Sequence, residues 1–412
     1  MTIRAAATGQ EMPSWLTPLL ATACGLIVAN IYYAQPLIGP ISAELGLSPA
    51  AAGLIVTLTQ VGYGAGLLLV VPAADLVENR RLVLAVMAVA AAGVVLAALS
   101  NAAAPFLLAS LLIGLGSVAV QILVPYAAHM APEQVRGRVV GNVMSGLMLG
   151  IMLARPVASL VTDLLSWHAV FWLSALVMLG LGVVLRVALP VRRPSPGLGY
   201  RALLGSMARL VMSQPALRRR ALYQAGMFGG FSVFWTAVPL HLARDFQLSQ
   251  SGIALFALAG VAGAVAAPIA GRVADRGWIR PASAGAMGLG ALAFLMSMPL
   301  SPVPGTQGST LALVLLVLAG IVLDFGVSAN VVLGQRVIFG LGDELRGRIN
   351  GLYMATFFMG GALGSALGGW SFAQGGWAIT AWMGLALPVL ALALFATERH
   401  GAKRRPERQG AS

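Results

Sequence analysis

The chain of 412 residues is 58% hydrophobic and only 9% charged, with a formal net charge of +13 and a mean hydropathy of +0.87. Soluble domains carry about 25% charged residues, so this composition excludes a soluble globular protein and predicts a protein embedded in lipid. The single cysteine, Cys24, excludes an intramolecular disulfide and any site built from several cysteines. Residues 1–15 lack the form of a cleavable signal peptide. The first long apolar segment is therefore expected to remain as a membrane-spanning helix.

Long apolar segments dominate the chain on both sides of a polar stretch between Arg186 and Arg220. A helix that crosses the hydrocarbon core needs about 20 apolar residues, and we expect twelve such segments. They lie near residues 16–35, 50–72, 82–100, 105–128, 139–162, 168–189, 221–242, 252–271, 282–299, 310–333, 350–370 and 377–396. We therefore predict an all-α polytopic membrane protein with twelve transmembrane helices in two pseudo-symmetric six-helix bundles.

The positions of the basic residues predict how these segments are oriented. If the N-terminus is cytoplasmic, 24 of the 26 lysines and arginines fall in inner loops and tails, eight of them between Arg186 and Arg220. Arg244 lies in an outer loop, and Arg155 lies within an apolar segment. Cytoplasmic loops of membrane proteins carry an excess of Lys and Arg. We expect a protein of a cell inner membrane with both termini cytoplasmic, and no nucleic-acid partner, because orientation already accounts for the positive charge.

This orientation divides the chain into four expected parts. Residues 1–189 form an N-terminal six-helix bundle, and residues 190–220 form a basic cytoplasmic linker. Residues 221–397 form a C-terminal six-helix bundle. Residues 398–412 form a basic cytoplasmic tail, which the anionic inner leaflet would attract.

An internal repeat relates the two sides of the linker. At an offset of 210 residues the Arg-Gly-Arg stretch at 136–138 recurs at 346–348, and at an offset of 200 residues the stretch 72–81 recurs at 272–280. A repeat in the same orientation predicts two bundles related by an axis along the membrane normal, with a cavity between them near the midplane. Rocking of one bundle against the other would then expose the cavity to each side in turn.

Residues 271–277 read Gly-Arg-Val-Ala-Asp-Arg-Gly, and Ala74, Asp75, Arg80 and Arg81 keep part of the same pattern in the first copy. This pattern resembles the loop motif Gly-x-Leu-Ala-Asp-Arg-x-Gly-Arg-Arg of the major facilitator superfamily, and the resemblance covers essentially the whole chain. It implies a latch between the halves on the cytoplasmic side, in which Asp75 pairs near Arg346 and Asp275 faces the region of Arg136. The alternative is that these are solvated loop acids. The implied latch residues are Asp75, Arg80, Arg81, Arg136, Arg138, Asp275, Arg276, Arg346 and Arg348.

The stretch Asn-Ile-Tyr-Tyr-Ala-Gln-Pro-Leu at residues 30–37 resembles members of the drug:proton antiporter branch of that superfamily. This resemblance implies proton-driven export. The branch usually carries an arginine in its fourth helix, whereas residues 107–121 contain no basic residue.

Two charged residues lie deep within apolar segments, Arg155 and Asp324. A charge at the centre of a membrane helix costs roughly 2.5–3.5 kcal/mol, so each is a functional candidate. Asp324 is a candidate for proton coupling or substrate binding, and Arg155 for binding an anion or a carboxylate. Distances along the two segments place Arg155 in the outer half and Asp324 in the inner half, too far apart to pair directly. The alternatives are a satisfied polar contact for Asp324 and snorkelling to the outer interface for Arg155.

Polar and aromatic residues in the first and fourth helices of each half form a further group of candidates, because in this superfamily those helices line the cavity. Each has packing as its alternative. The candidates are Asn30, Tyr33, Gln121, Tyr223, Gln224, Trp235 and Asn330. Glycines at 360, 364 and 368, and at 141, 146 and 150, are expected to form close helix-packing seams.

The expected function is secondary active transport of small organic molecules by alternating access, with proton-coupled efflux preferred. One alternative is an importer or exchanger of a small anionic metabolite, and another is a non-transporting membrane sensor with a transporter fold. No nucleotide-binding P-loop is present, and we expect neither enzyme activity, nor a cofactor, nor a bound metal. The expected partners are a small-molecule substrate, protons and the lipid bilayer, and we expect a monomer.

Overall fold

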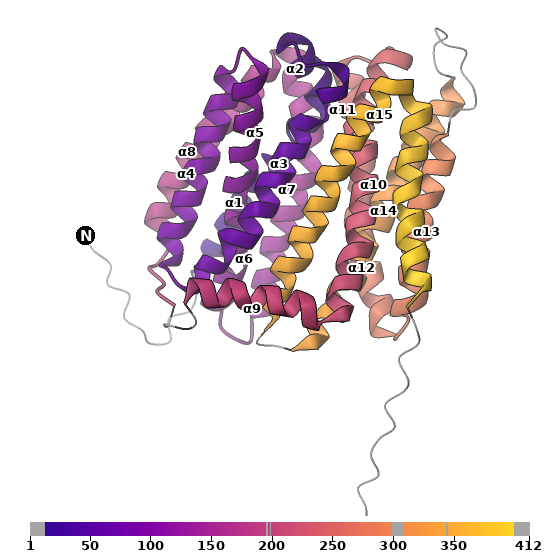
Figure 1. The fold of residues 1–412 in the computed structure, drawn as a ribbon. Coiled ribbons are helices and arrows are strands. Elements are labelled where there is room, and N and C mark those ends of the chain that lie inside the picture. The colour runs from indigo at the N-terminus through magenta and orange to yellow at the C-terminus, as the bar shows by residue number, and fades with distance from the viewer. Residues whose placement is uncertain (1–12, 195–196, 198, 299–308, 343–344, 399–412) are drawn as a thin grey trace, which may run out of the picture.

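The computed structural model describes residues 13–194, 197, 199–298, 309–342 and 345–398. The predicted C-terminal tail, apart from Glu398, lies outside the described residues. All regular structure within the described part is helical, which confirms the all-α class. Figure 1 shows long helices standing side by side, with α9 (Tyr200–Ser213) lying across their lower ends. We call this the inner end, following the predicted orientation.

The helices before α9 form the first half of the molecule. The segment predicted at 16–35 is not one continuous helix, since α1 ends at Ala29 and a short 3-10 turn and α2 follow it. The elements are α1 (Leu16–Ala29), η1 (Gln35–Leu37), α2 (Ile38–Glu44), η2 (Pro49–Ala51), α3 (Leu54–Leu69), η3 (Val71–Asp75), α4 (Asn79–Leu99), α5 (Ala103–Ser117), α6 (Ala119–Met130), α7 (Arg136–Leu164) and α8 (Trp167–Ala188).

The helices after α9 form the second half. The segment predicted at 252–271 is interrupted by a 3-10 turn. The elements are α10 (Pro215–Asp245), α11 (Gln250–Ala257), η4 (Leu258–Val261), α12 (Ala262–Asp275), α13 (Ile279–Ser297), α14 (Thr310–Ile338), η5 (Phe339–Leu341) and α15 (Arg346–Ala396).

Helix α15 has 51 residues, which would span about 75 Å if it were straight. Its backbone leaves helical geometry at Gly375 (φ −157°, ψ 28°) and Gly376 (φ 62°, ψ −153°). The positive φ of Gly376 is readily adopted only by glycine. The two parts of α15, orange and yellow in Figure 1, therefore run antiparallel on either side of α10.

Nine helices of the described part are long and apolar enough to cross a membrane. The shorter α1, with 14 residues, and the more polar α10 are not among them, and the folded-back α15 counts once. The fold is thus that of a membrane protein with many spans, while the number twelve stays a prediction.

Glycines allow close packing at corresponding places in the two halves. A Cβ atom on Gly25 of α1 would lie 2.6 Å from the carbonyl oxygen of Gly146 in α7, and one on Gly150 would overlap the backbone of Gly25. In the second half, Gly360 and Gly364 of α15 pack in the same way against the α10 backbone at Ala225 and Gly229. These contacts confirm the predicted seams, except at Gly141, which has no neighbour within 4 Å of a built Cβ.

The two halves contact each other along α3 and α15, between α7 and α11, and between α10 and the η1–α2 region. Polar bonds cross this interface: Gln60 Nε2 donates to Ser232 Oγ (3.1 Å), and Ser365 Oγ donates to the Gly53 carbonyl (3.0 Å). At the inner end, α9 joins both halves. Tyr200 donates to the Leu69 carbonyl (2.6 Å), and Arg348 donates to Ser206 Oγ of α9 (2.9 Å).

Candidate functional site

The two intramembrane charges lie on opposite sides of the interface between the halves. Arg155 belongs to α7 of the first half and Asp324 to α14 of the second, and only 3% and 4% of their surfaces are exposed. The glycine seam between α1 and α7 brings Arg155 beside the turn that follows α1. Burial excludes the alternative in which Arg155 snorkels to the outer interface.

The two charges lie closer in depth than predicted, although, as predicted, they form no direct ion pair in the described part of the chain. Helices α7 and α14 each have 29 residues, more than a bilayer requires. Asp324 lies at the midpoint of α14, and Arg155 lies five residues past the midpoint of α7, a rise of about 8 Å. The long arginine side chain covers this difference in depth.

Aromatic rings surround the Arg155 guanidinium. Its Cζ lies 4.3 Å from the ring centre of Trp235, 5.1 Å from that of Phe231 and 5.2 Å from that of Tyr32. Rings attract a cation at these distances through their quadrupoles. Arg155 Nε also donates a hydrogen bond of 2.7 Å to Gln35 Oε1. The cation is therefore stabilised by groups from both halves without direct contact with an acid.

Trp235 connects the arginine to the acid, because its indole Nε1 donates to Asp324 Oδ1 (2.8 Å). Within the described residues no ion pair joins Arg155 to Asp324, although the two side chains approach the same glycine. A Cβ built on Gly260 would lie 2.9 Å from Asp324 Oδ2 and 3.1 Å from Arg155 Nη1. Gly260 lies in η4, so the 3-10 turn between α11 and α12 packs directly beside both charges.

Two buried donors at this site have no hydrogen-bond partner among the described atoms, Arg155 Nη2 and Gln35 Nε2. A buried donor without a partner costs about 1–3 kcal/mol. Most buried polar groups in proteins are satisfied, so an unsatisfied pair in one place indicates a site that receives a ligand or water.

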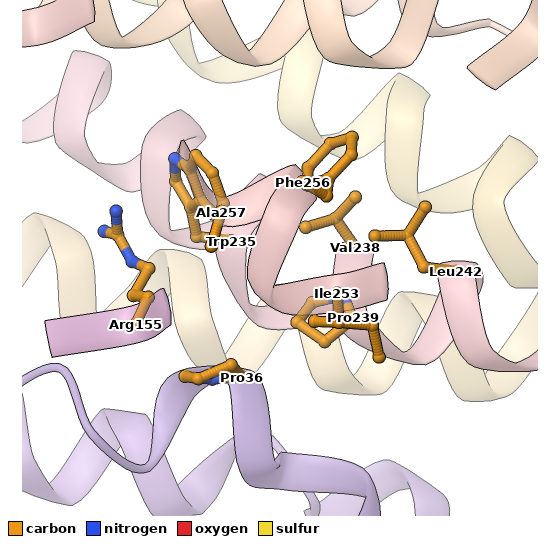
Figure 2. A pocket seen from close by; sticks show the side chains of 9 residues that line it. All are labelled: Pro36, Arg155, Trp235, Val238, Pro239, Leu242, Ile253, Phe256 and Ala257. Carbon is orange, nitrogen blue, oxygen red and sulfur yellow. The ribbon is translucent and has the colours of Figure 1, made fainter. Parts of the chain in front are cut away.

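A small pocket lies beside Arg155 between the halves. Figure 2 shows Arg155 and Trp235 on one side of it and Phe256, Val238 and Leu242 on the other. Its lining combines one cation with apolar side chains. The residues that line it are Pro36, Arg155, Trp235, Val238, Pro239, Leu242, Ile253, Phe256 and Ala257.

Of the seven expected cavity residues, only Trp235 contacts both Arg155 and Asp324. Asn30 accepts a hydrogen bond from Ser174 of α8 (2.5 Å) and donates to carbonyls of α1, so it holds helices of the first half together. Gln121 donates to the hydroxyl of Tyr63 (3.0 Å), and Tyr33 is half-buried against two apolar clusters, one of which spans both halves. These three side chains serve packing in this structure.

The remaining candidates lie further inward in the second half. Asn330 of α14 donates to Gln224 of α10 (2.7 Å), both are buried, and Gln224 Nε2 has no partner among the described atoms. Tyr223 is fully buried, edge-on to the Phe395 ring near the inner end. The Gln224–Asn330 pair is thus a second polar position between α10 and α14, separate from Arg155.

Sequence reasoning missed four neighbours of the central charges: Tyr32, Gln35, Phe231 and Gly260. Phe231 and Trp235 are four residues apart on α10, a spacing that places them on one helix face. Tyr32 and Gln35 belong to the Asn30–Leu37 stretch already singled out. Helical spacing could have found Phe231, but no local signal links Gly260 to Arg155.

Five of the predicted latch residues have described contacts within a half or with α9. Asp275 forms an ion pair with Arg336 of α14, within its own half. Its expected position facing the region of Arg136 stays a prediction. Arg136 donates to the Ala128 carbonyl at the end of α6 (3.0 Å). Arg80 and Arg81 both lie near Glu78, and Arg348 binds α9. Asp75, Arg138 and Arg276 are exposed. The proposed role of these residues in latching stays a prediction.

Comparison with known proteins shows the family to which the chain belongs. Residues 20–202 and 220–412 match the model of the Major Facilitator Superfamily. The chain is 40% identical over 369 residues to the putative uncharacterized transporter YgaY of Escherichia coli (strain K12), covering 89% of this chain and 91% of that protein. It is 33% identical over 362 residues to the probable transporter SCO4007 of Streptomyces coelicolor, covering 87% and 82%.

The fold is also found in solved structures. The crystal structure of the peptide transporter POT in complex with alafosfalin aligns with a TM-score of 0.75 at 17% identity, covering 95% of each chain. At that identity the likeness concerns the fold alone. The family model matches nearly the whole chain, and the chain has the same helical fold as a solved transporter structure. The protein therefore belongs to the major facilitator superfamily and is a membrane-embedded transporter of that type.

Proposed function

We propose that the protein is a secondary active transporter of small organic molecules, working by alternating access and coupled to protons at Asp324. One observation carries this proposal: a buried arginine of the first half and a buried aspartate of the second half approach the same glycine without pairing. Charges inside a membrane are costly and are retained where they bind a substrate or an ion.

The division of the site between the halves supports coupling. Tyr32, Gln35 and Arg155 belong to the first half, whereas Trp235 and Asp324 belong to the second. Any rocking of the halves changes the distance between the two charges. A proton on Asp324 removes one of those charges. Protonation would therefore shift the equilibrium between the positions of the halves, and the position of the halves would shift the proton affinity of Asp324.

Proton-coupled efflux is the first candidate for the direction of transport. It rests on the resemblance of residues 30–37 to the drug:proton antiporter branch. In this mode a proton and the exported molecule would occupy the site in turn, and a substrate with a positive or neutral group would compete with the proton at Asp324.

Uptake or exchange of a small anionic metabolite is the second candidate. It is favoured by a specific observation, since Arg155 Nη2 is buried without a partner among the described atoms. In this mode the anion would bind to the arginine while Asp324 carries the proton.

Reconstitution tests the proposed coupling. Purified protein in liposomes with an internal pH dye should move protons when a transported solute is supplied, and Asp324→Asn should abolish this movement. Asp163→Asn, an exposed aspartate of α7, is the matched control and should keep wild-type rates. Failure of every supplied drug, sugar and organic acid to move protons through the wild-type protein would instead favour a membrane sensor with a transporter fold.

A further inference from the structure

The site around Arg155 has more free donors than free acceptors. Arg155 Nη2 and Gln35 Nε2 are both unpartnered among the described atoms, and their side chains are 3% and 1% exposed. A guanidinium nitrogen and an amide nitrogen carry only N–H donors. The group that completes their hydrogen bonding must therefore be an acceptor.

Two of the nearby acceptors are already engaged, and only Asp324 Oδ2, beside Gly260, has no hydrogen bond among the described atoms. Gln35 Oε1 accepts from Arg155 Nε, and Asp324 Oδ1 accepts from Trp235. An amine entering this site would find aromatic faces that the arginine already occupies. A carboxylate would find two unused donors, one of them on a cation that binds carboxylates through parallel hydrogen bonds.

The adjoining pocket indicates the rest of the molecule. Beyond Arg155 its lining is apolar, with Val238, Leu242, Ile253 and Phe256 among the side chains. A sugar or a dicarboxylate needs several polar partners in its pocket, and this lining supplies one charged group. This lining favours a molecule with a single carboxylate and an apolar body, and because the pocket is small in this structure, the halves would have to move apart to admit a body the size of benzoate.

Resting on the proton-coupled transport proposed above, we infer that the substrate is a small organic monocarboxylate that binds together with one proton. Its carboxylate accepts from Arg155 Nη2 and Gln35 Nε2, and its apolar body enters the pocket between α10 and α11. No covalent bond forms or breaks.

The charge balance of the site requires the proton. With Asp324 ionised, Arg155 and Asp324 together are neutral, and an added carboxylate would leave a net negative charge in a low-dielectric interior. Such an uncompensated buried charge costs several kcal/mol. A proton from solution on Asp324 restores neutrality, so the anion and the proton enter together. This coupling favours the second candidate, uptake or exchange of an anionic metabolite, over efflux in exchange for protons.

Calorimetry on the purified full-length protein in chloride-free buffer tests the inference. The probes are benzoate and hexanoate, with benzamide and benzylamine as the neutral and cationic analogues of benzoate. We expect the carboxylates to bind and the analogues not to bind. Titrations in two buffers of different ionisation enthalpy should show that about one proton is taken up per carboxylate, as neutralisation of Asp324 requires.

Three variants assign the effect to the site. Arg155→Lys keeps the charge but loses the planar fork, and it should weaken carboxylate binding about tenfold or more. Asp324→Asn should bind the carboxylates without proton uptake. Arg209→Lys, at an exposed position of α9, should bind as the wild type does.

Four results would overturn the inference: binding of neither carboxylate, binding of benzylamine or benzamide as tight as that of benzoate, undiminished binding to Arg155→Lys, or equal binding of chloride alone. The two proposals fail separately. Carboxylate binding with proton uptake, but without pH-driven flux in liposomes, would refute transport and leave the anion site standing. Asp324-dependent proton flux without carboxylate binding would refute the substrate class and leave transport standing.

Discussion

Gly260 occupies the point where a side chain would come between the two central charges. A methyl group there would lie 2.9 Å from Asp324 Oδ2, 3.1 Å from Arg155 Nη1 and 3.5 Å from the Trp235 ring. The first two distances are shorter than an ordinary van der Waals contact. All three side chains are buried, so they have little room to move away. The residue matters because it leaves space, not because it supplies a functional group.

We expect Gly260→Ala to fold and to lose solute-driven proton flux by about tenfold or more, because misplacing a reacting group by about 1 Å is that costly. The flux in liposomes is the measurement. Gly271→Ala is the control, since Gly271 follows in the same helical region and a Cβ there has no neighbour within 4 Å. Equal losses in the two variants would show that the effect comes from the helix and not from the site.

The charged pair was visible in the sequence because an arginine or an aspartate within an apolar segment stands out by composition. Their mutual position was not visible. It depends on where long helices begin, and α7 and α14 both exceed the length from which depth was estimated. Tyr32, Gln35 and Phe231 were missed because ordinary aromatic and amide residues acquire their role only when α1, α7 and α10 pack together.

At the scale of elements, matching glycine seams set how closely the helices approach. Gly364 of α15 packs directly on the backbone of Gly229 in α10, and Gly150 of α7 packs on Gly25 of α1. The spacing of four residues predicted this role, since small residues on one helix face allow backbones to meet. The seam also fixes the face of α10 that carries Phe231 and Trp235 toward the first half.

Replacing Gly364 by alanine should lower the free energy of unfolding by about 1–3 kcal/mol, because overpacking forces the two backbones apart. Denaturant titration in detergent measures this loss. Gly285→Ala in α13, where a Cβ has no neighbour within 4 Å, should leave stability nearly unchanged. If the denaturation midpoint of Gly364→Ala equalled that of the wild type, α10 and α15 would have moved apart at little cost, and the prediction would be wrong.

Helix breaks were harder to predict than helices. The apolar run 252–271 reads as one span, yet η4 interrupts it at the position that contacts both charges. The first span likewise ends early, at Ala29, and the chain then turns through η1 into α2. Tertiary packing decides such breaks, and a single sequence does not display the partners that compensate the lost backbone bonds.

At the scale of the whole molecule, the halves are joined differently at their two ends. In the described part of the chain, α7 packs against α11 and η4 but shows no comparable packing against α12. On the inner half of α7, Asn142 and Ser145 are exposed. Polar side chains within a membrane helix usually face a bundle interior or a water-filled space. We therefore expect water to reach this face from the inner end.

Cysteine labelling checks this expectation and the predicted orientation together. The native Cys24 is fully buried, so it should contribute little background. Asn142→Cys should react with a membrane-impermeant maleimide in inside-out vesicles and not in intact cells. Leu179→Cys, on an exposed apolar face of α8, is the lipid-facing control and should not react. Labelling of Asn142→Cys in intact cells would show that the predicted orientation is wrong. No labelling in either preparation would show that this face of α7 contacts lipid and not water.

The repeat and the distribution of arginines predict two like-oriented bundles, because both signals extend over many residues. The contact between the bundles was beyond such reasoning. It depends on single side chains such as Gln60 and Ser232 from distant segments, whose pairing no periodicity reveals.

Because Arg155 lies in one half and Asp324 in the other, their charges also affect the movement of the transporter when no substrate is bound. With Asp324 ionised, the empty molecule is electrically balanced and is free to return. With a proton but no cargo, Arg155 would be left as a lone charge in a poorly polarisable interior, and that reorientation would be slow. If substrate and proton bind together as proposed, the same arrangement would prevent protons from leaking across the membrane when no substrate is bound.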